Sequence, residues 1–334
     1  MLTRRCMPPR HWVATAVKFT RPAMPEIQLP DRTLQADEGA NLLDCLLENG
    51  IALPWSCRAG HCQSCLVQSL DGRIPEAAHA QLSVEQRQSG WLLACQCRID
   101  SAMQIKPYDP SRDGMTARIV SLSHLSGDVL ILRLKPERPV RFKAGQHMLL
   151  WLANGLCRPY SIASLPSESE LAFHVRLHPA GQFSAAIAAC QVGDRLSLSP
   201  ASGHMHYDPD WQDKPLLLLA SGTGLAPLQA IARQALLEGN GQPMQIWHWS
   251  HGSAESYWGD HLQALKLGSP QLDVHLGDRA NLAADLAHLR LVSRRTQALV
   301  CGSSAFIEQV RKRLFMAGLA ARQIVDEAFL NRRP

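Results

Sequence analysis

The order of apolar and polar residues predicts a small α+β domain near the start of the chain. Residues 26–29 and 31–36 alternate on either side of a Pro-Asp turn, which predicts a hairpin. Four leucines within residues 42–47 recur at helical spacing, and Asn41 can cap the helix that they predict. Asp71-Gly72 predicts a turn between two further short strands.

Alternating stretches dominate the middle of the chain and predict an antiparallel barrel. The expected strands cover residues 116–122, 129–134, 147–152 and 171–177. One helix is predicted from Gly181 through Cys190.

In the last third, apolar runs alternate with helical patterns, which predicts a parallel sheet covered on both faces. Strands are expected at residues 216–219 and 245–249, and another runs into Val300. A helix is expected at 305–318, and the C-terminal segment 324–329 follows it.

Breaker-rich residues divide the chain and predict a multi-domain protein. The predicted parts are a basic extension at 1–23, an α+β domain at 25–108, a linker at 109–114, a barrel at 115–211 and a parallel-sheet domain at 212–334. The extension shows no sustained periodicity. We expect it to be disordered, or to reflect a start codon upstream of Met24.

Composition and charge narrow the class of protein. Hydrophobic residues make up 46% of the 334 residues, and no apolar run approaches the ~18 residues of a membrane span. The net charge of +5 equals that of residues 1–23, which carry five basic residues and no acid. Residues 24–108 are acidic and the rest is basic, which favours electrostatic docking between the domains over a nucleic-acid partner.

Four of the ten cysteines follow the pattern C-x4-C-x2-C, with a fourth after 29 intervening residues. This is the spacing of a plant-type [2Fe–2S] ferredoxin. Ala59 and Gly60 are small enough for the loop backbone to turn its N–H groups toward the inorganic sulfides. The expected cluster ligands are Cys57, Cys62, Cys65 and Cys95.

Two alternatives to a cluster remain open at this point. Zinc usually takes two C-x2-C pairs at shorter separation, and only one clean pair is present. The cysteines can also be buried apolar residues, as we expect for Cys45 and Cys97. Because residues 1–23 lack the apolar core of a signal peptide, ten cysteines suit a reducing cytoplasm.

Two motifs in the barrel are suited to an anion. Residues 158–164 read RPYSIAS, in which Arg158 can bind a phosphate bidentately and Tyr160 offers a flat face. The predicted helix at Gly181 opens with free N–H groups and the positive end of its dipole, which favour a pyrophosphate. Alone, the arginine motif is weak, since a strand-edge arginine beside a buried tyrosine is also an ordinary structural arrangement.

A glycine-rich turn follows the first strand of the last third. Gly222 and Gly224 let the backbone approach a pyrophosphate, and Pro227 suits the first turn of a helix. Cys301-Gly302 follows a later strand, where Cys301 can also be a plain core cysteine.

Taken together, these motifs and their order resemble the three-module electron-transfer reductase components of bacterial oxygenases. That family joins a β-grasp [2Fe–2S] ferredoxin domain to the flavin barrel and nicotinamide domain of the ferredoxin–NADP reductase superfamily. The resemblance implies FAD and NADH or NADPH as further cofactors, and catalytic roles for Ser161, Cys301 and Glu327. The cofactor-binding residues implied are Arg158, Tyr160, Ser161, Val175, Gly181, Gln182, Phe183, Ser184, Gly222, Thr223, Gly224, Leu225, Pro227, Cys301, Gly302 and Phe329.

Within that resemblance each role is specific. The tyrosine packs on the isoalloxazine, the following hydroxyl lies near flavin N5, and the arginine holds phosphate. The Cys-Gly turn lies beside the nicotinamide, and the C-terminal acid and aromatic residue lie near the flavin.

The chain departs from the family pattern in three places. Residues 301–304 read Cys-Gly-Ser-Ser instead of Cys-Gly-Pro-Pro, and Gln182 replaces a common second glycine. Residues 250–252 read Ser-His-Gly where many members have glycine followed by arginine. His204-Met205-His206 offers two imidazoles, which we expect on one face of a surface strand with no third metal ligand nearby.

The resemblance implies an NAD(P)H-dependent reductase that delivers single electrons to an oxygenase, a hydroxylase or a ferredoxin. Flavin must stand between the other carriers because nicotinamide gives up hydride and the cluster accepts one electron. A reductase for sugar deoxygenation and a slow redox-sensing module remain alternatives. We expect a cytoplasmic monomer that prefers NADH, with Arg279 as the residue able to overturn that preference.

Overall fold

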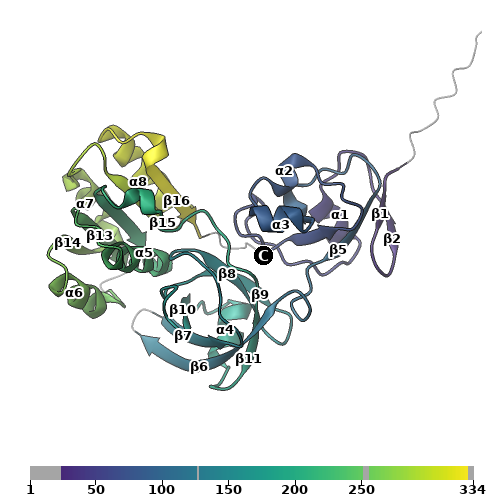
Figure 1. Cartoon of the computed structure of the whole chain (residues 1–334), viewed down its shortest axis with the longest axis horizontal. Helices are drawn as coiled ribbons and strands as arrows, with labels where there is room; N and C mark the ends of the chain where they lie inside the picture. The colour runs from purple at the N-terminus through teal and green to yellow at the C-terminus, as the bar shows by residue number, and fades with distance from the viewer. Residues whose placement is uncertain (1–23, 126–127, 251–255, 330–334) are drawn as a thin grey trace, which may run out of the picture.

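The computed structural model describes residues 24–125, 128–250 and 256–329. Three sheets form three lobes, and the lobe of the middle sheet lies between the other two (Figure 1). Within the described residues, no helix is long and apolar enough to cross a bilayer. The expectations for residues 1–23 and 251–252 fall outside the described residues.

The first lobe is a mixed five-stranded sheet in the order β2-β1-β5-β3-β4. The predicted hairpin and helix are confirmed, and Asn41 Oδ1 accepts hydrogen bonds from the first turn of α1. The strands are β1 (Glu26–Gln28), β2 (Thr33–Gln35), β3 (Leu66–Ser69), β4 (Trp91–Leu93) and β5 (Met103–Pro107). The helices are α1 (Leu42–Glu48), α2 (Glu76–His79), α3 (Val84–Gln88) and the 3-10 turn η1 (Ala94–Gln96).

The prediction that Asp71-Gly72 joins two strands is wrong. The segment leaves β3 and leads into α2. Asp71 accepts hydrogen bonds from the backbone of Arg73 and Gln104, so its carboxylate ties the bend to β5. A side chain that bonds the backbone nearby offers an alternative to a hairpin ladder.

The second lobe is an antiparallel six-stranded sheet in the order β10-β7-β6-β11-β8-β9. A bridge between Ile162 and Phe173 brings its two edges together, as in a barrel. All four predicted strands are confirmed, and β9 and β11 are additions. The elements are β6 (Met115–Leu125), β7 (Val129–Pro136), β8 (His147–Trp151), β9 (Cys157–Ser161), β10 (Leu171–Arg176), α4 (Gln182–Ala188) and β11 (Arg195–Leu198).

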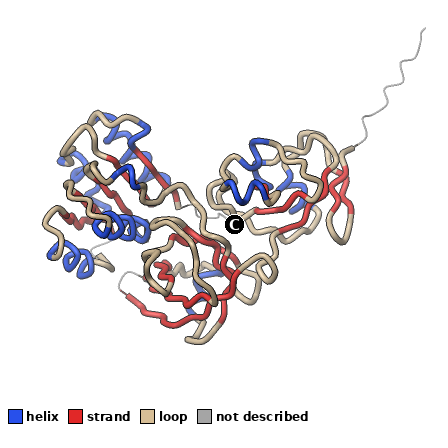
Figure 2. The backbone as a smooth tube through the Cα atoms, in the orientation of Figure 1, coloured by secondary structure: helices blue, strands red, loops and turns tan. Residues whose placement is uncertain are grey.

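The third lobe is a parallel sheet in the order β14-β13-β12-β15-β16 with helices on both faces (Figure 2). Leu216 and Leu218 pack with α5 on one face, and Leu217 and Leu219 pack with α8 on the other. The strands are β12 (Leu216–Ser221), β13 (Met244–Ser250), β14 (Leu272–Asp278), β15 (Gln297–Gly302) and β16 (Ile324–Ala328). The helices are α5 (Leu225–Leu237), α6 (Gly259–Leu267), α7 (Leu282–His288) and α8 (Ser304–Met316), with 3-10 turns η2 (Pro209–Trp211), η3 (Gly222–Gly224), η4 (Arg279–Asn281) and η5 (Ala321–Gln323).

Strand order reverses at β12, because the chain first adds β13 and β14 on one side and then β15 and β16 on the other. Ligands of open α/β sheets bind at such a switch point, outside the carboxyl ends of the strands. The crevice expected here lies between the ends of β12 and β15, where the sequence has its glycine turn and Cys301.

Strand β8 touches all three lobes, and all five of its residues are buried. Met148 and Leu150 belong to the barrel core, whereas Leu149 and Trp151 pack in the core of the first lobe. Trp151 stacks on Tyr108 with ring centroids 6.0 Å apart. His147 Nδ1 lies 3.3 Å from Glu327 Oε1 on β16.

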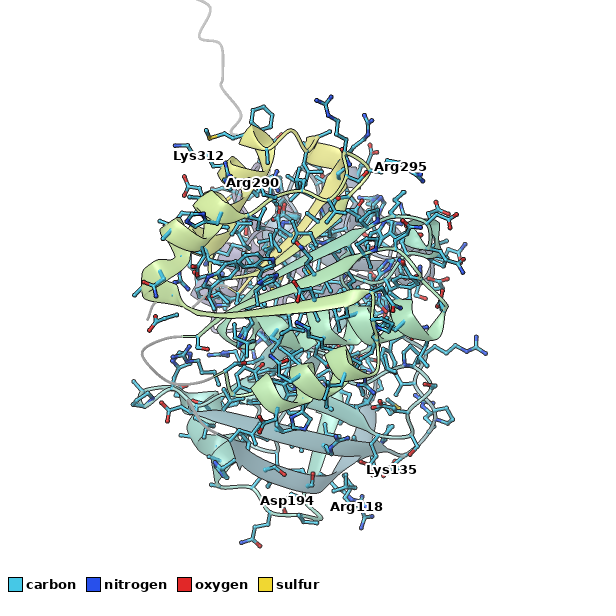
Figure 3. The ribbon with its side chains drawn as sticks, turned by 90° about the vertical axis from the view of Figure 1, so that its left-hand side faces the viewer. Arg118, Lys135, Asp194, Arg290, Arg295 and Lys312 are labelled. Atoms are coloured by element: carbon cyan, nitrogen blue, oxygen red, sulfur yellow. The ribbon has the colours of Figure 1, made fainter. Side chains whose placement is uncertain are left out.

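The contact between the first lobe and the barrel is therefore apolar, and the expected electrostatic docking does not account for it. The charged residues labelled in Figure 3, all of the second and third lobes, extend outward instead: Arg118, Lys135, Asp194, Arg290, Arg295 and Lys312. The connection at 109–114 is a hydrogen-bonded turn in which Asp113 N donates to Asp109 O at 2.7 Å.

Gly224 offers a direct test of this packing. A Cβ atom there would lie 2.2 Å from Cys301 O and 3.0 Å from Gly302 N, both backbone atoms. We expect Gly224→Ala to cost about 1–3 kcal/mol of stability, as overpacking does, and to lower the melting temperature. Gly241→Ala is the control, because nothing lies within 4 Å of its Cβ position. Equal melting temperatures for the two variants would contradict the close approach of η3 to β15.

Candidate functional site

The four predicted cluster cysteines gather as two pairs. Cys57 N and Cys62 N each lie within 3.4 Å of the other residue's sulfur, and Cys95 N lies 3.5 Å from Cys65 Sγ. Among the described residues, no three His, Cys, Asp or Glu side chains converge as ligands of one ion. A [2Fe–2S] cluster has two irons, each with two thiolates, whereas structural zinc needs four ligands around one point. The arrangement fits the cluster.

The ligand loop is held in an unusual backbone conformation. Arg58, Gly60 and Gln63 have positive φ angles of 52°, 83° and 54°. Such angles are uncommon for residues other than glycine, and they mark a loop whose shape is imposed by its surroundings. In this conformation Ala59 N donates to Cys57 Sγ at 3.3 Å, so the loop backbone directs an N–H group to a ligand sulfur.

In each pair, the pKa of one thiol is lowered. The hydrogen bond with the Cys62 thiol, helped by backbone N–H groups, lowers the pKa of Cys57 to about 5. The same contact raises the pKa of Cys62. The Cys65 thiol likewise lowers the pKa of Cys95 to about 7. Because thiolates are the metal-binding form, Cys57 and Cys95 are the thiols of their pairs that ionise more readily for ligation, whereas the pKa values of Cys62 and Cys65 are raised.

Cys45 and Cys97 lie in the core of the first lobe, as expected. Burial raises the pKa of the Cys97 thiol to about 12. Cys95 lies in the 3-10 turn η1, two residues before Cys97.

The barrel motifs lie together. Tyr160 on β9 and Phe183 on α4 have ring centroids 5.3 Å apart. Arg158 Nη1 donates to Cys157 O at 2.7 Å, and its side chain is half-buried. Gly181 caps α4, and Gln182 is exposed at the helix start.

Two implied flavin residues have structural roles. Ser184 Oγ accepts a hydrogen bond from His178 N at 3.1 Å and lies 3.0 Å from Gly181 O, so this hydroxyl closes the turn before α4. Val175 is fully buried in the barrel core. Any contact of Val175 with a cofactor would therefore use its backbone.

The three predicted catalytic residues are joined by His147. Ser161 pairs with His147 in the β8–β9 ladder, and Glu327 pairs with Cys301 in the β15–β16 ladder. The contact of His147 with Glu327 links the two ladders. Ser161 Oγ and Glu327 Oε2 are buried, and neither has a hydrogen-bond partner among the described residues. Buried polar atoms of this kind fit a polar cofactor edge.

The two motifs expected beside the nicotinamide, the glycine-rich turn after β12 and the Cys301-Gly302 turn, contact each other at the switch point. Gly222 has a φ of +57°, and Gly224 packs against Cys301 O and Gly302 N. Phe329 N donates to Gly302 O at 2.7 Å, and burial raises the pKa of the Cys301 thiol. Half-buried Thr223 lies between the glycines, and Leu225 and Pro227 are buried in the first turn of α5.

Arg279 crosses this edge of the sheet. Its guanidinium donates to Ser221 Oγ and to Ser303 Oγ, each at 2.9 Å. It therefore joins the ends of β12 and β15, where the glycine-rich turn begins.

The sequence did not identify three residues of this site, namely His147, Gly203 and Arg176. His147 was expected only as a strand residue, although a histidine opening an apolar run is a recognisable signal. A Cβ at Gly203 would lie 2.7 Å from His147 Nδ1, so this glycine makes room for the ring. A Cβ at Gly222 would lie 3.5 Å from Arg176 Nη1, which brings a barrel cation to the nicotinamide turn.

Comparison with known proteins supports this arrangement. A 2Fe-2S iron-sulfur cluster binding domain matches residues 26–100, and an oxidoreductase FAD-binding domain matches residues 116–207. The reductase component of naphthalene 1,2-dioxygenase from Pseudomonas putida is 29% identical over 91% of this chain and 97% of its own. The reductase subunit of an aromatic O-demethylase from Amycolatopsis is 31% identical over 69% and 73%.

Solved structures share the whole fold. The Amycolatopsis reductase GcoB aligns with a TM-score of 0.62 and 26% identity, over 91% of this chain and 98% of that one. A ferredoxin reductase in carbazole 1,9a-dioxygenase aligns with a TM-score of 0.61 and 24% identity, over 92% and 98%.

Fold, cysteine pairs and relatives lead to one assignment. The chain belongs to the family of ferredoxin–NAD(P) reductase components of oxygenase systems, oxidoreductases that use a [2Fe–2S] cluster, FAD and NAD(P)H.

Proposed function

We propose that this chain takes hydride from NADH and passes the electrons singly, through FAD and the cluster, to an aromatic-ring oxygenase. The observation that carries the proposal is the meeting of Ser161, Glu327 and Cys301 around His147, with the paired thiols in the lobe docked on the same strand β8. The naphthalene and O-demethylase relatives support an aromatic substrate for the partner.

We assign the flavin site to the crevice between the barrel and the sheet of the third lobe. Tyr160 and Phe183 supply flat faces for the ring, and Arg158 supplies the cation for phosphate. When bound there, FAD accepts hydride and releases electrons one at a time.

The protein's own residues prepare the hydride step. Gly224 lets the glycine-rich turn pack directly on the backbone of Cys301 and Gly302, so the two turns expected to hold the nucleotide form one continuous surface. Ser161 Oγ and Glu327 Oε2 offer polar atoms with no competing partner among the described residues. Cys301 is fully buried, and desolvation keeps its thiol protonated and uncharged beside the nicotinamide.

The remaining assignments follow from the same features. We place the domains at 25–108, 115–211 and 212–334, joined by 109–114. The nine described cysteines form no disulfides, which supports a cytoplasmic location. No observation favours the sugar-deoxygenation or redox-sensing alternatives over the oxygenase partner.

Metal content tests the cluster. Anaerobically purified protein should carry about two irons and two sulfides per chain. Cys95→Ser should lose the irons and sulfides, because one of the two irons would retain only one cysteine thiolate. Cys97→Ser and Cys45→Ser are controls and should retain iron, since both thiols lie in the core. Zinc in place of iron would end this interpretation.

Electron flow can be tested by measuring reduction of the flavin by NADH separately from transfer through the cluster. Cys95→Ser should abolish reduction of cytochrome c, a one-electron protein acceptor, and leave NADH-driven ferricyanide reduction in place. The reason is that ferricyanide can take electrons at the flavin, before the cluster. Loss of both activities in a variant that still binds flavin would refute the path from flavin to cluster to partner.

Nucleotide preference is tested at Arg279. We expect a higher kcat/KM for NADH than for NADPH, because Arg279 is engaged by Ser221 and Ser303. Arg279→Ala should raise KM for both nucleotides through the loosened strand ends, without reversing the preference. An NADPH preference that disappears in Arg279→Ala but persists in Arg279→Lys would show that this cation binds the 2′-phosphate.

A further inference from the structure

One exposed contact joins all three lobes. His61 lies in the ligand loop between Gly60 and Cys62, and its ring centroid is 5.6 Å from that of His204. His204 follows β11 in the barrel, and its Nε2 lies 3.0 Å from Asp326 O on β16. His204 was expected on a surface strand, but its segment is irregular and it meets the other two lobes instead.

His204 stands next to the residues that shape the flavin site. The preceding Gly203 makes room for the His147 ring, and Ser202 Oγ lies 3.1 Å from His147 Nε2. Asp326 is likewise the chain neighbour of Glu327 and forms an ion pair with Arg311. The backbone before His204 therefore contacts His147, and the backbone that His204 contacts on β16 adjoins Glu327.

His61 stands next to one half of the cluster. It precedes Cys62, which is half-buried and paired with Cys57. The other pair contains Cys65, which is 3% exposed within the core of the first lobe. Of the two irons expected from this pairing, the one that Cys57 and Cys62 would hold is therefore the one whose ligand adjoins His61 in the sequence.

We propose that the His61–His204 contact is where electrons enter the ferredoxin domain, on the side of the iron held by Cys57 and Cys62. The inference rests on the proposed function. One electron crosses at a time, and two crossings balance the two electrons that nicotinamide gives up as hydride. Trp151 and Tyr108 hold the lobes together, and the histidine pair sets how closely the ligand loop approaches the flavin site.

Anaerobic stopped-flow absorbance tests the contact in the holoprotein. His204→Ala should slow reduction of the cluster by NADH about tenfold, with ferricyanide reduction and iron content unchanged. His204→Gln keeps a donor for Asp326 O but removes the ring, so it should be slowed in the same way. His206→Ala is the matched control and should be unaffected, because His206 Nδ1 contacts only the neighbouring Tyr207 O among the hydrogen bonds described.

A double-mutant cycle and hydrogen exchange test whether the two rings act together, or whether each substitution only disturbs its own lobe. If the rings act as a pair, His61→Ala together with His204→Ala should be no slower than either change alone. His61→Ala should also speed amide exchange in residues 202–207, far away in sequence.

The outcomes distinguish failure of the proposed entry point from failure of the proposed function. Normal cluster reduction in both His204 variants, with full iron and flavin, would overturn the entry point and leave the proposed function intact. A wild-type holoprotein whose cluster NADH does not reduce would instead refute the proposed function.

Discussion

The architecture depends on strand β8 being buried on both faces. One face, with Met148 and Leu150, fills the barrel core. The other face carries His147, Leu149 and Trp151 at alternate positions, and it contacts the third lobe at one end and the first lobe at the other. A strand that completes two cores cannot shift register without exposing one of them. The relative position of the two redox sites is therefore fixed by five consecutive residues.

This constraint explains how three carriers can work in sequence. Hydride chemistry needs the nicotinamide turn and the flavin face close together, and Gly224 lets the glycine-rich turn pack directly on the backbone of Cys301 and Gly302. One-electron chemistry needs the cluster near the same flavin but separate from nicotinamide. His147 and Trp151 lie at opposite ends of β8, so the barrel packs against both neighbours at separate places, and His204 is where the two neighbours approach each other.

Local chemistry predicted most of the site, and tertiary packing decided the rest. The spacing of Cys57, Cys62, Cys65 and Cys95 singled out the four cysteines that the structure brings together as two pairs, because this spacing reflects the loop itself. The helix at Asn41 and the turn at Gly222 were also predictable, since caps and glycine turns use neighbouring residues. The pairing of Cys57 with Cys62 was not, because it depends on how the loop folds back. His147, Gly203 and Arg176 escaped for the same reason, as their partners are far away in sequence. The turn predicted at Asp71-Gly72 was wrong because the Asp71 carboxylate accepts a hydrogen bond from Gln104 N on β5, which is distant in sequence.

The central claim is that electrons from NADH reach a [2Fe–2S] cluster within this one chain. Its most direct test is an anaerobic titration of the holoprotein with NADH, followed by low-temperature electron paramagnetic resonance. The account predicts the signal of a one-electron-reduced [2Fe–2S] cluster, rising to about one spin per chain. A bleached flavin with no cluster signal at any NADH concentration would contradict it.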